Sequence, residues 1–332
     1  MKIIVLGSGA WGTALGNLLC ENGYEVFLWN RSSERAEEMQ RTGCNPRLKG
    51  ISLHPALQCT ADLNLASQCE MVVFAVPSFA IRETAAAVRP FLRENAVMVS
   101  VTKGIEPETG LRMTQIIAQE TGRVTAALSG PSHAEEVSKH IPTGCVSACE
   151  QDGVAEWVQD VFMNEYFRVY ATKDVVGVEL SAALKNVIAL CAGVSDGLGL
   201  GDNTKALLVT RGLTELARLG VALGGHVETF AGLAGVGDMI VTCTSVHSRN
   251  RSAGYLIGQG VPVEEAMTQV GAVVEGYYAA RSALELSRKV GVEMPITEQA
   301  YNVLYKGASP KDAVLGLMAR TKKHEFEDAG WT

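Results

Sequence analysis

The chain has 332 residues, of which 47% are hydrophobic and 20% are charged, and its formal net charge is −7. These values are typical of a globular protein, so they exclude a largely disordered chain, and the length favours two domains. The acidic balance argues against a nucleic-acid partner, because phosphate binding needs a basic field. No apolar run reaches the roughly 20 residues of a membrane span, so we expect no integral membrane segment.

The first half of the chain alternates short apolar runs with segments of helical pattern. Several runs are continuously apolar, as strands covered on both faces should be. The alternation predicts a doubly wound parallel α/β sheet with right-handed crossovers. The expected strands occupy residues 2–6, 25–29, 71–76, 96–101, 125–129, 144–148 and 167–171, and helices are expected at 12–22, 33–40 and 112–120.

The pattern changes after about residue 176. Strand-like runs disappear, and long stretches rich in Ala, Leu, Glu and Arg follow, separated by glycine-rich breaks such as 197–201. We therefore expect a sheet domain at residues 1–178 and an all-helical domain at residues 179–332.

The cysteines, the histidines and the start of the chain indicate which cellular compartment and which kinds of site to expect. The eight cysteines form no Cys-x-x-Cys pair, which favours reduced thiols over a disulfide framework. The six histidines are scattered, so we expect no metal site. The apolar start of the chain is interrupted by Gly7, Gly9 and Gly12, which argues against a signal peptide and favours the cytoplasm.

Residues 7–12 read Gly-Ser-Gly-Ala-Trp-Gly, a G-x-G-x-x-G pattern placed after an apolar strand and before a helix. In this context Gly7 permits the tight turn, and Gly9 lets a pyrophosphate approach the backbone. Gly12, together with Gly16, lets the helix pack closely on the sheet. The helix N-terminus presents free N–H groups to the phosphates, so the motif predicts a dinucleotide site.

The end of the second expected strand bears on the choice of dinucleotide. A carboxylate that binds the ribose 2′-hydroxyl of NAD usually stands near Asn30, and none is present. Arg31, with Ser32 and Ser33, suits a 2′-phosphate instead. We therefore favour NADP(H) and leave use of NAD(H) open.

Three further strand ends carry polar or glycine residues, and ligands of such sheets bind outside the carboxyl ends of the strands. One is Val76-Pro-Ser78, another places Lys103 after a strand, and the third contains Gly130 and Ser132. Their position at consecutive strand ends favours a ligand site over three unrelated turns.

One lysine stands in an otherwise apolar helical segment, residues 179–193. The i, i+3, i+4 spacing of its apolar residues predicts a helix buried nearly all round, with Lys185 and Asn186 as its strongly polar members. A buried ammonium needs a partner or a ligand, and such a lysine can serve as a general acid or base. The alternative is a lysine that reaches the surface or pairs with a carboxylate such as Glu179.

A polar cluster follows in residues 235–251. It contains Asp238, Thr242 and the run Ser248-Arg-Asn-Arg251 at the expected start of a helix. Because an arginine fork and helix N–H groups both suit phosphate oxygens, the cluster indicates a phosphate site. A solvated basic helix start is the alternative.

Short motifs spread over the whole chain resemble, in order, those of one enzyme family. The set is similar to that of the bacterial, soluble, non-flavin NAD(P)-dependent sn-glycerol-3-phosphate dehydrogenases, over residues 1–320. The motifs are Gly7-Ser-Gly-Ala-Trp-Gly12, Ala75-Val-Pro-Ser78, Thr102-Lys-Gly104, Ser129-Gly-Pro-Ser132, Leu184-Lys-Asn186, Gly235-Val-Gly-Asp238, Thr242-Cys-Thr244, Ser248-Arg-Asn250 and Val274-Glu-Gly276.

The resemblance implies a Rossmann-type domain followed by a helical domain. It also implies reversible hydride transfer between dihydroxyacetone phosphate and sn-glycerol 3-phosphate, which supplies glycerophospholipid synthesis. Lys185 would be the catalytic proton donor, with Lys103 polarising the carbonyl. The other implied substrate contacts are Gly130, Ser132, Asn186, Asp238, Thr242, Ser248, Arg249 and Asn250. The implied cofactor contacts are Gly7, Gly9, Ala10, Trp11, Gly12, Arg31, Lys103, Ala134, Arg249, Val273 and Glu275.

Two other functions remain open at this point. One is a related two-domain reductase acting on a 3-hydroxy acid, and the other is a nicotinamide-binding sensor without turnover. The sensor gives a buried Lys185 no function. The cluster at 235–250 and tests with substrates are what distinguish the hydroxy-acid reductase. The many apolar helices of the second half also leave a homodimer open.

Overall fold

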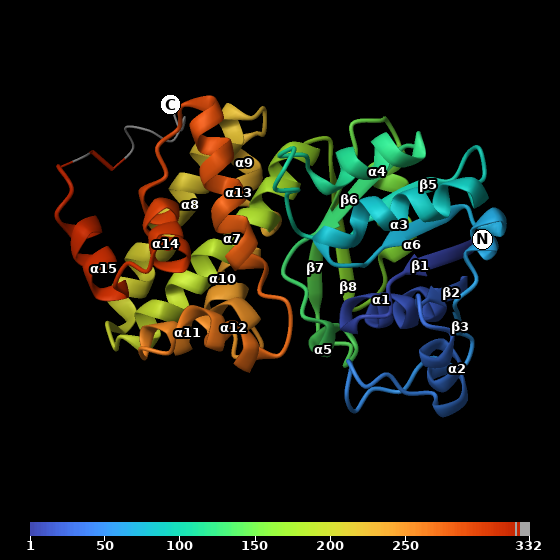
Figure 1. Ribbon diagram of the computed structural model, residues 1–332. Helices are drawn as coiled ribbons and strands as arrows, with labels where there is room; N and C mark the ends of the chain where they lie inside the picture. Colours follow the sequence, from blue (N-terminus) through green and yellow to red (C-terminus); the bar gives the residue numbers. More distant parts are fainter. Residues whose placement is uncertain (323, 326–332) are drawn as a thin grey trace. The chain divides into compact units, whose positions relative to one another are not determined.

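The computed structural model describes residues 1–322, 324 and 325. The chain divides into two compact units (Figure 1). The first contains Met1–Lys103 and Arg112–Val175, and the second contains Gly104–Leu111 and the chain from Val176 onward.

A single eight-stranded sheet forms the centre of the first unit. Its strands are β1 (Lys2–Leu6), β2 (Glu25–Trp29), β3 (Gln58–Thr60), β4 (Met71–Phe74), β5 (Val97–Ser100), β6 (Thr125–Ser129), β7 (Thr143–Ala148) and β8 (Phe167–Thr172). In space they are ordered β3-β2-β1-β4-β5-β6-β7-β8. Strand order reverses beside β1, which pairs with both β2 and β4, and this is where doubly wound sheets bind their ligands.

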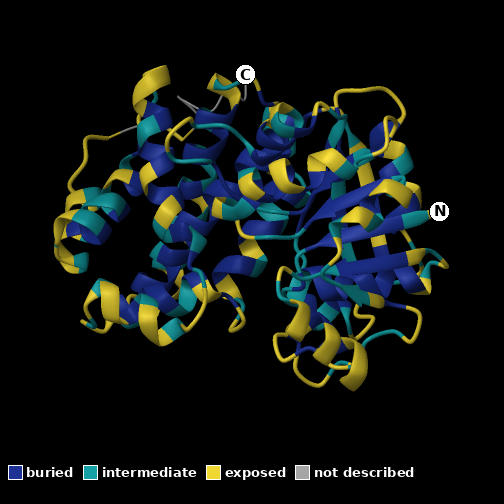
Figure 2. Cartoon of the chain, turned by 45° about the vertical axis from the view of Figure 1, so that its right-hand side comes forward, coloured by how far each residue is buried: buried dark blue, intermediate teal, exposed yellow. Residues whose placement is uncertain are grey.

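The helices of this unit form two groups around the sheet (Figure 1). They are α1 (Ala10–Glu21), α2 (Ser33–Thr42), α3 (Ile81–Val88), α4 (Met113–Thr121), α5 (Ala134–Val137) and α6 (Val154–Phe162). Helix α3 packs against α4, whereas α1 contacts α5 and α6. Strands β1 and β4 are almost entirely buried, as their continuous apolar sequences predict. Figure 2 shows buried residues concentrated on the strands and exposed residues on the outer turns and loops.

The predicted α/β fold class is confirmed, with two corrections to its sheet. Strand β7 runs antiparallel to β6, while all other strand pairs are parallel. Only the four-residue helix α5 lies between β6 and β7, instead of a full crossover helix. Strand β3 was not predicted, because its three residues are too short to show a pattern.

All described elements after β8 are helical, as predicted. They are α7 (Val175–Gly197), α8 (Gly201–Ala222), α9 (Val227–Ala231), the π-helical turn η4 (Leu233–Gly237), α10 (Asp238–Thr244), α11 (Arg249–Gly258), α12 (Val263–Val270), α13 (Glu275–Val290), α14 (Pro295–Lys306) and α15 (Pro310–Met318).

Helix α7 is the core helix of the second unit. It is longer at both ends than the predicted segment, and is long and apolar enough to cross a membrane, which corrects the expectation that no segment reaches this length. However, 89% of its most apolar window is buried inside the protein. Leu184 and Ile188 belong to one hydrophobic cluster of the unit, and Val187 and Leu190 belong to another. The helix is therefore buried on two faces, against two different sets of neighbours.

Candidate active site

The glycine motif forms the connection between β1 and α1. Gly7 has a φ of +114°, and an added Cβ there would lie 2.7 Å from the carbonyl oxygen of Ala75. A Cβ on Gly12 would lie 1.9 Å from the carbonyl oxygen of Gly7, so any side chain would push α1 away from the strand. Gly9, in contrast, has no atom within 4 Å of an added Cβ. The open space is at the middle glycine, where a pyrophosphate is expected to approach.

The remaining part of the dinucleotide motif agrees with an anion site at the start of α1. Gly9 is the N-cap of this helix and provides no side-chain cap, and its first turn contains no acidic residue. The first N–H groups are therefore available to a phosphate. Gly16 packs against the side chain of Leu57, which precedes β3, instead of against the sheet itself.

Asn30 links the glycine loop to the end of β2. Its amide nitrogen donates to Ser8 Oγ at 2.6 Å, and its amide oxygen accepts from the backbone N–H of Ser32 at 2.9 Å. This asparagine stands where a ribose-binding carboxylate is usual, and it joins the glycine loop to the loop that follows β2. Arg31 follows it directly and is exposed.

Lys103 is brought close to Gly130 and Ser132, as expected from their positions at neighbouring strand ends. Lys103 Nζ donates to the carbonyl oxygen of Gly130 at 3.1 Å, and Ser132 Oγ donates to the same oxygen at 2.9 Å. Gly130 has a φ of +153°, and an added Cβ would lie 2.9 Å from Cα of Cys145. A larger residue would disturb this group of three.

Three of the predicted cofactor residues share a small apolar cluster in the first unit. Ala134 is buried in it, and Ala10 and Trp11 pack against it. Val273 and Glu275 instead lie in the second unit, before and at the start of α13. Arg249 also lies there, as the first residue of α11, and is exposed.

Lys185 and Asp238 form a buried ion pair in the second unit. The lysine side chain is 5% exposed, and Nζ lies 2.6 Å from Oδ1 of Asp238, whose side chain is 2% exposed. Lys185 Nζ also donates to Thr242 Oγ1. The carboxylate stabilises the charge on the ammonium inside an apolar helix pair. The structure thus pairs Lys185 with Asp238, and neither surface exposure nor pairing with Glu179 is needed to explain its burial.

A π-helical turn places Asp238 at the start of α10. Residues Leu233–Gly237 form this turn, and an added Cβ on Gly235 would lie 2.0 Å from the carbonyl oxygen of Phe230. Such turns are rare and occur frequently at functional sites. One turn later, Thr242 Oγ1 donates to the carbonyl oxygen of Asp238 at 2.6 Å, which orients the hydroxyl beside Lys185.

A second polar chain connects three helices beside Lys185. Asn250 Nδ2 on α11 donates to Asn186 Oδ1 on α7 at 3.0 Å, and the backbone N–H of Gly276 on α13 donates to Asn250 Oδ1 at 2.8 Å. Ser248 caps α11 by accepting from the backbone N–H of Arg251 at 3.3 Å. The predicted residues Asn186, Ser248, Arg249 and Asn250 therefore belong to one arrangement.

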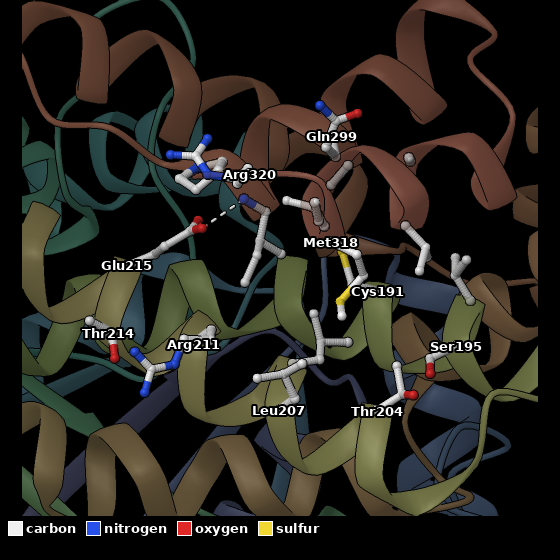
Figure 3. Close-up of a pocket in the computed structure, with 18 of the residues that line it drawn as sticks. Cys191, Ser195, Thr204, Leu207, Arg211, Thr214, Glu215, Gln299, Met318 and Arg320 are labelled. Carbon is white, nitrogen blue, oxygen red and sulfur yellow. Dashed lines mark hydrogen bonds between the residues drawn. The ribbon is translucent and has the colours of Figure 1, made fainter. Parts of the chain in front are cut away.

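A cavity of about 330 Å³ lies within the second unit, and no pattern in the sequence indicated it (Figure 3). Its walls are mainly apolar, and among the described residues none of those predicted for substrate or cofactor lines it. Glu215 lies in its wall and accepts from the backbone N–H groups of Ile296 at 2.7 Å and Thr297 at 3.2 Å. Burial raises the pKa of Glu215 to about 7.

The cysteines offer no reactive thiol in the helical core. All eight are free thiols. Burial raises the pKa of Cys191 and of Cys243 to about 12, so both stay protonated and weakly nucleophilic at neutral pH. Cys243, between Thr242 and Thr244, is therefore a packing residue.

Comparison with known proteins identifies the family of this chain. Residues 2–155 match the model of the NAD-dependent glycerol-3-phosphate dehydrogenase N-terminus, and residues 174–315 match that of the C-terminus. The chain belongs to this family. Its predicted class, a nicotinamide-dependent glycerol-3-phosphate dehydrogenase, is confirmed.

Individual dehydrogenases of the family match the chain over nearly its full length. A glycerol-3-phosphate dehydrogenase (NAD(P)+) from Moorella thermoacetica is 52% identical, with 99% of each chain covered. Another from Pelotomaculum thermopropionicum is 54% identical, with 98% of this chain and 95% of the relative covered. The crystal structure of the Coxiella burnetii glycerol-3-phosphate dehydrogenase superposes with a TM-score of 0.92 at 37% identity, covering 96% of this chain and 99% of that chain.

Proposed function

We propose that the chain reduces dihydroxyacetone phosphate reversibly to sn-glycerol 3-phosphate, with Lys185 as the proton donor. The observation that carries the proposal is the buried ammonium of Lys185, held by Asp238 and Thr242 in a member of this dehydrogenase family. An ammonium at 2.6 Å from a buried carboxylate is oriented and charged before the substrate arrives, which is the preorganisation that electrostatic catalysis requires.

The residues of the first unit fit a nicotinamide dinucleotide. The space in front of Gly9 and the uncapped start of α1 can accept a pyrophosphate. These two local features support a dinucleotide site independently of the fold. When bound, the cofactor supplies the hydride. The proposed contacts from the first unit are Gly7, Gly9, Ala10, Trp11, Gly12, Arg31, Lys103 and Ala134. Those proposed from the second unit are Arg249, Val273 and Glu275.

We favour NADP(H) as the cofactor because of the residues at the end of β2. Asn30 already uses its amide groups to join Ser8 and Ser32, and it carries no charge to repel a 2′-phosphate. Arg31 is exposed next to it and can pair with that phosphate.

Lys185 acts on the carbonyl oxygen of the substrate. As hydride reaches the carbonyl carbon, negative charge develops on the oxygen, and the ammonium stabilises that charge and then transfers a proton from Nζ. In the reverse direction the neutral amine accepts the hydroxyl proton. Lys103 contacts the same carbonyl group, while Asn186, Asp238 and Thr242 line the reacting carbons.

The substrate phosphate serves as a handle away from the reacting carbon. Arg249 and Asn250, on the first turn of α11, bind it together with Ser248, and Gly130 and Ser132 line the substrate further along. Binding energy from the phosphate positions the carbonyl, so it increases turnover of the phosphorylated ketone over the unphosphorylated one.

The wider setting follows from the same proposal. The first unit would bind the dinucleotide and the second the substrate, in the roles that the sequence predicts for residues 1–178 and 179–332. The product supplies glycerophospholipid synthesis in the cytoplasm, and the apolar helices of the second unit make a homodimer the assembly to test.

The deciding experiment measures oxidation of NADPH and of NADH by the purified chain with dihydroxyacetone phosphate. Unphosphorylated dihydroxyacetone is the control. Oxidation that depends on the phosphate supports the proposal, and the ratio of the two cofactors tests the preference. Folded protein that binds NADPH but oxidises neither cofactor would overturn it.

A further inference from the structure

Helix α11 carries the proposed phosphate ligands, and glycines hold its backbone directly against α7. An added Cβ on Gly254 of α11 would lie 1.9 Å from the carbonyl oxygen of Leu190, and one on Gly258 would lie 2.4 Å from that of Val194. On α7, a Cβ on Gly193 would lie 2.0 Å from the carbonyl oxygen of Arg251. The two backbones are therefore in contact over two turns.

These contacts fix the two helices in one register. The pairs Asn186–Asn250, Leu190–Gly254 and Val194–Gly258 share the same sequence offset, so α7 and α11 run parallel. The first pair is a hydrogen bond within the proposed site, and the other two are close backbone contacts. A small slide or tilt of α11 would therefore move Arg249 and Asn250 relative to Lys185.

Close backbone packing limits the distance between the helices, but it does not prevent α11 from tilting away. A partly buried ion pair supplies that restraint. Arg251 on α11 donates to Asp196 Oδ2 on the last turn of α7 from Nε at 2.8 Å, and its Nη2 lies 2.7 Å from the same oxygen. The side chain of Asp196 is 14% exposed and that of Arg251 is 22% exposed. At this burial the pair is weakly screened by solvent.

The other oxygen of Asp196 is used by a helix that carries no proposed site residue. Lys205 Nζ on α8 lies 2.7 Å from Asp196 Oδ1, and the lysine side chain is 21% exposed. Arg251 and Lys205 thus pair with one carboxylate at similar distance and similar burial. They differ in the helix that they tie to α7.

We propose that Arg251 and Asp196 are positioning residues that hold α11 on α7, so that Arg249 and Asn250 meet the substrate phosphate in the geometry that Lys185 requires. This inference rests on the proposed function of the site. Lys205 stabilises the fold through the same carboxylate without positioning the phosphate ligands.

The test compares Arg251→Met with the matched control Lys205→Met. A displaced phosphate site misplaces the carbonyl of the phosphorylated substrate, so Arg251→Met should raise KM for dihydroxyacetone phosphate about tenfold and also lower kcat. Its kcat/KM for unphosphorylated dihydroxyacetone should remain at the wild-type value. Lys205→Met should leave kcat and KM unchanged for both substrates, even where it lowers the thermal unfolding midpoint as much as Arg251→Met does.

Two further variants keep the test decisive. Asp196→Asn should reproduce the KM effect of Arg251→Met. Arg251→Lys should restore part of the loss, because a lysine keeps the charge but lacks the fork that gives two contacts. If Arg251→Met does not fold, these two variants answer the same question.

The outcomes separate this inference from the proposed function. Equal losses of kcat/KM in Arg251→Met and Lys205→Met would refute the positioning role. A parallel loss of kcat/KM for dihydroxyacetone phosphate and for dihydroxyacetone in Arg251→Met would refute it as well. Wild-type protein without phosphate-dependent turnover would instead refute the proposed function and leave no site to position.

Discussion

The two units build their sites by opposite means. In the first unit, Gly7, Gly9 and Gly12 act through the absence of side chains, and the groups offered to a ligand are backbone N–H groups at a helix start. In the second unit, Lys185 and Asp238 act through charged side chains that are almost fully buried. A backbone site tolerates little change in size, whereas a buried charge site tolerates little change in charge. Each unit therefore predicts a different response to substitution.

The largest effect on activity and stability is expected at Lys185, which carries both a buried charge and the proposed proton transfer. Lys185→Met should lower kcat about a thousandfold, since it removes the general acid. It should also cost about 3–5 kcal/mol of unfolding free energy, because Asp238 is left buried without its cation. Turnover, NADPH binding and urea unfolding are the three measurements.

A double variant separates the two losses. Lys185→Met combined with Asp238→Asn removes the uncompensated charge, so stability should return while kcat stays about a thousandfold below wild type and NADPH binding is preserved. Recovery of turnover in the double variant would contradict the role of Lys185 as proton donor.

Glu215 extends the contrast to pH. Its pKa in the folded state, about 7, exceeds the ordinary carboxyl value of 4.5 because of burial, so the folded protein binds a proton that the unfolded chain has already released. This contribution to stability is full below pH 4.5 and is lost as pH rises through 7, a change of about 3 kcal/mol. Urea unfolding from pH 4 to pH 8 measures it.

Glu215→Gln should remove that pH dependence, because an amide does not titrate. Its single oxygen keeps only one of the two backbone N–H contacts to Ile296 and Thr297, and this loss should lower stability by an amount that does not depend on pH. The comparison uses the difference between the two proteins at each pH, so that other titrating groups cancel. Parallel curves for the two proteins would show that Glu215 does not carry the effect.

The backbone site gives a pair of glycine variants with opposite signatures. Gly12→Ala should destabilise the fold by about 1–3 kcal/mol, because its methyl group meets the carbonyl oxygen of Gly7. Gly9→Ala should change stability by less than about 1 kcal/mol and weaken NADPH binding, because its methyl group occupies the open space that we assign to the pyrophosphate. Thermal unfolding and fluorescence titration with NADPH distinguish the two variants. Equal NADPH affinity in Gly9→Ala and wild type would show that the pyrophosphate does not occupy that space.

The smallest effect concerns the exposed Arg31. Arg31→Ser should lower kcat/KM with NADPH about fivefold and leave that with NADH unchanged, since one exposed ionic contact is worth about 1 kcal/mol. Steady-state kinetics with both cofactors measure the ratio. An unaltered ratio would mean that the preference is set elsewhere.

The same contrast explains what the sequence could predict. The glycine motif, its strand and its helix are contiguous, so their local pattern indicates both fold and ligand. The partner of Lys185 lies 53 positions away, and no local pattern selects Asp238 over Glu179 as the buried carboxylate. The reversal of β7 was missed because an apolar strand reads alike in either direction. The matching glycine spacing of Gly193–Gly197 and Gly254–Gly258 was present in the sequence and could have indicated the close helix pair.

Helix α7 has a consequence for the chain before it is folded. Its hydropathy is that of a transmembrane segment, and the helices that cover it, from α8 to α14, are synthesised after it. Until those helices form, the apolar faces of α7 have no protein to cover them. Lys185 stands near the centre of this helix, where a lysine adds about 3 kcal/mol to the cost of insertion. The residue proposed to donate the proton thus also makes α7 less favourable in a bilayer than in the folded core.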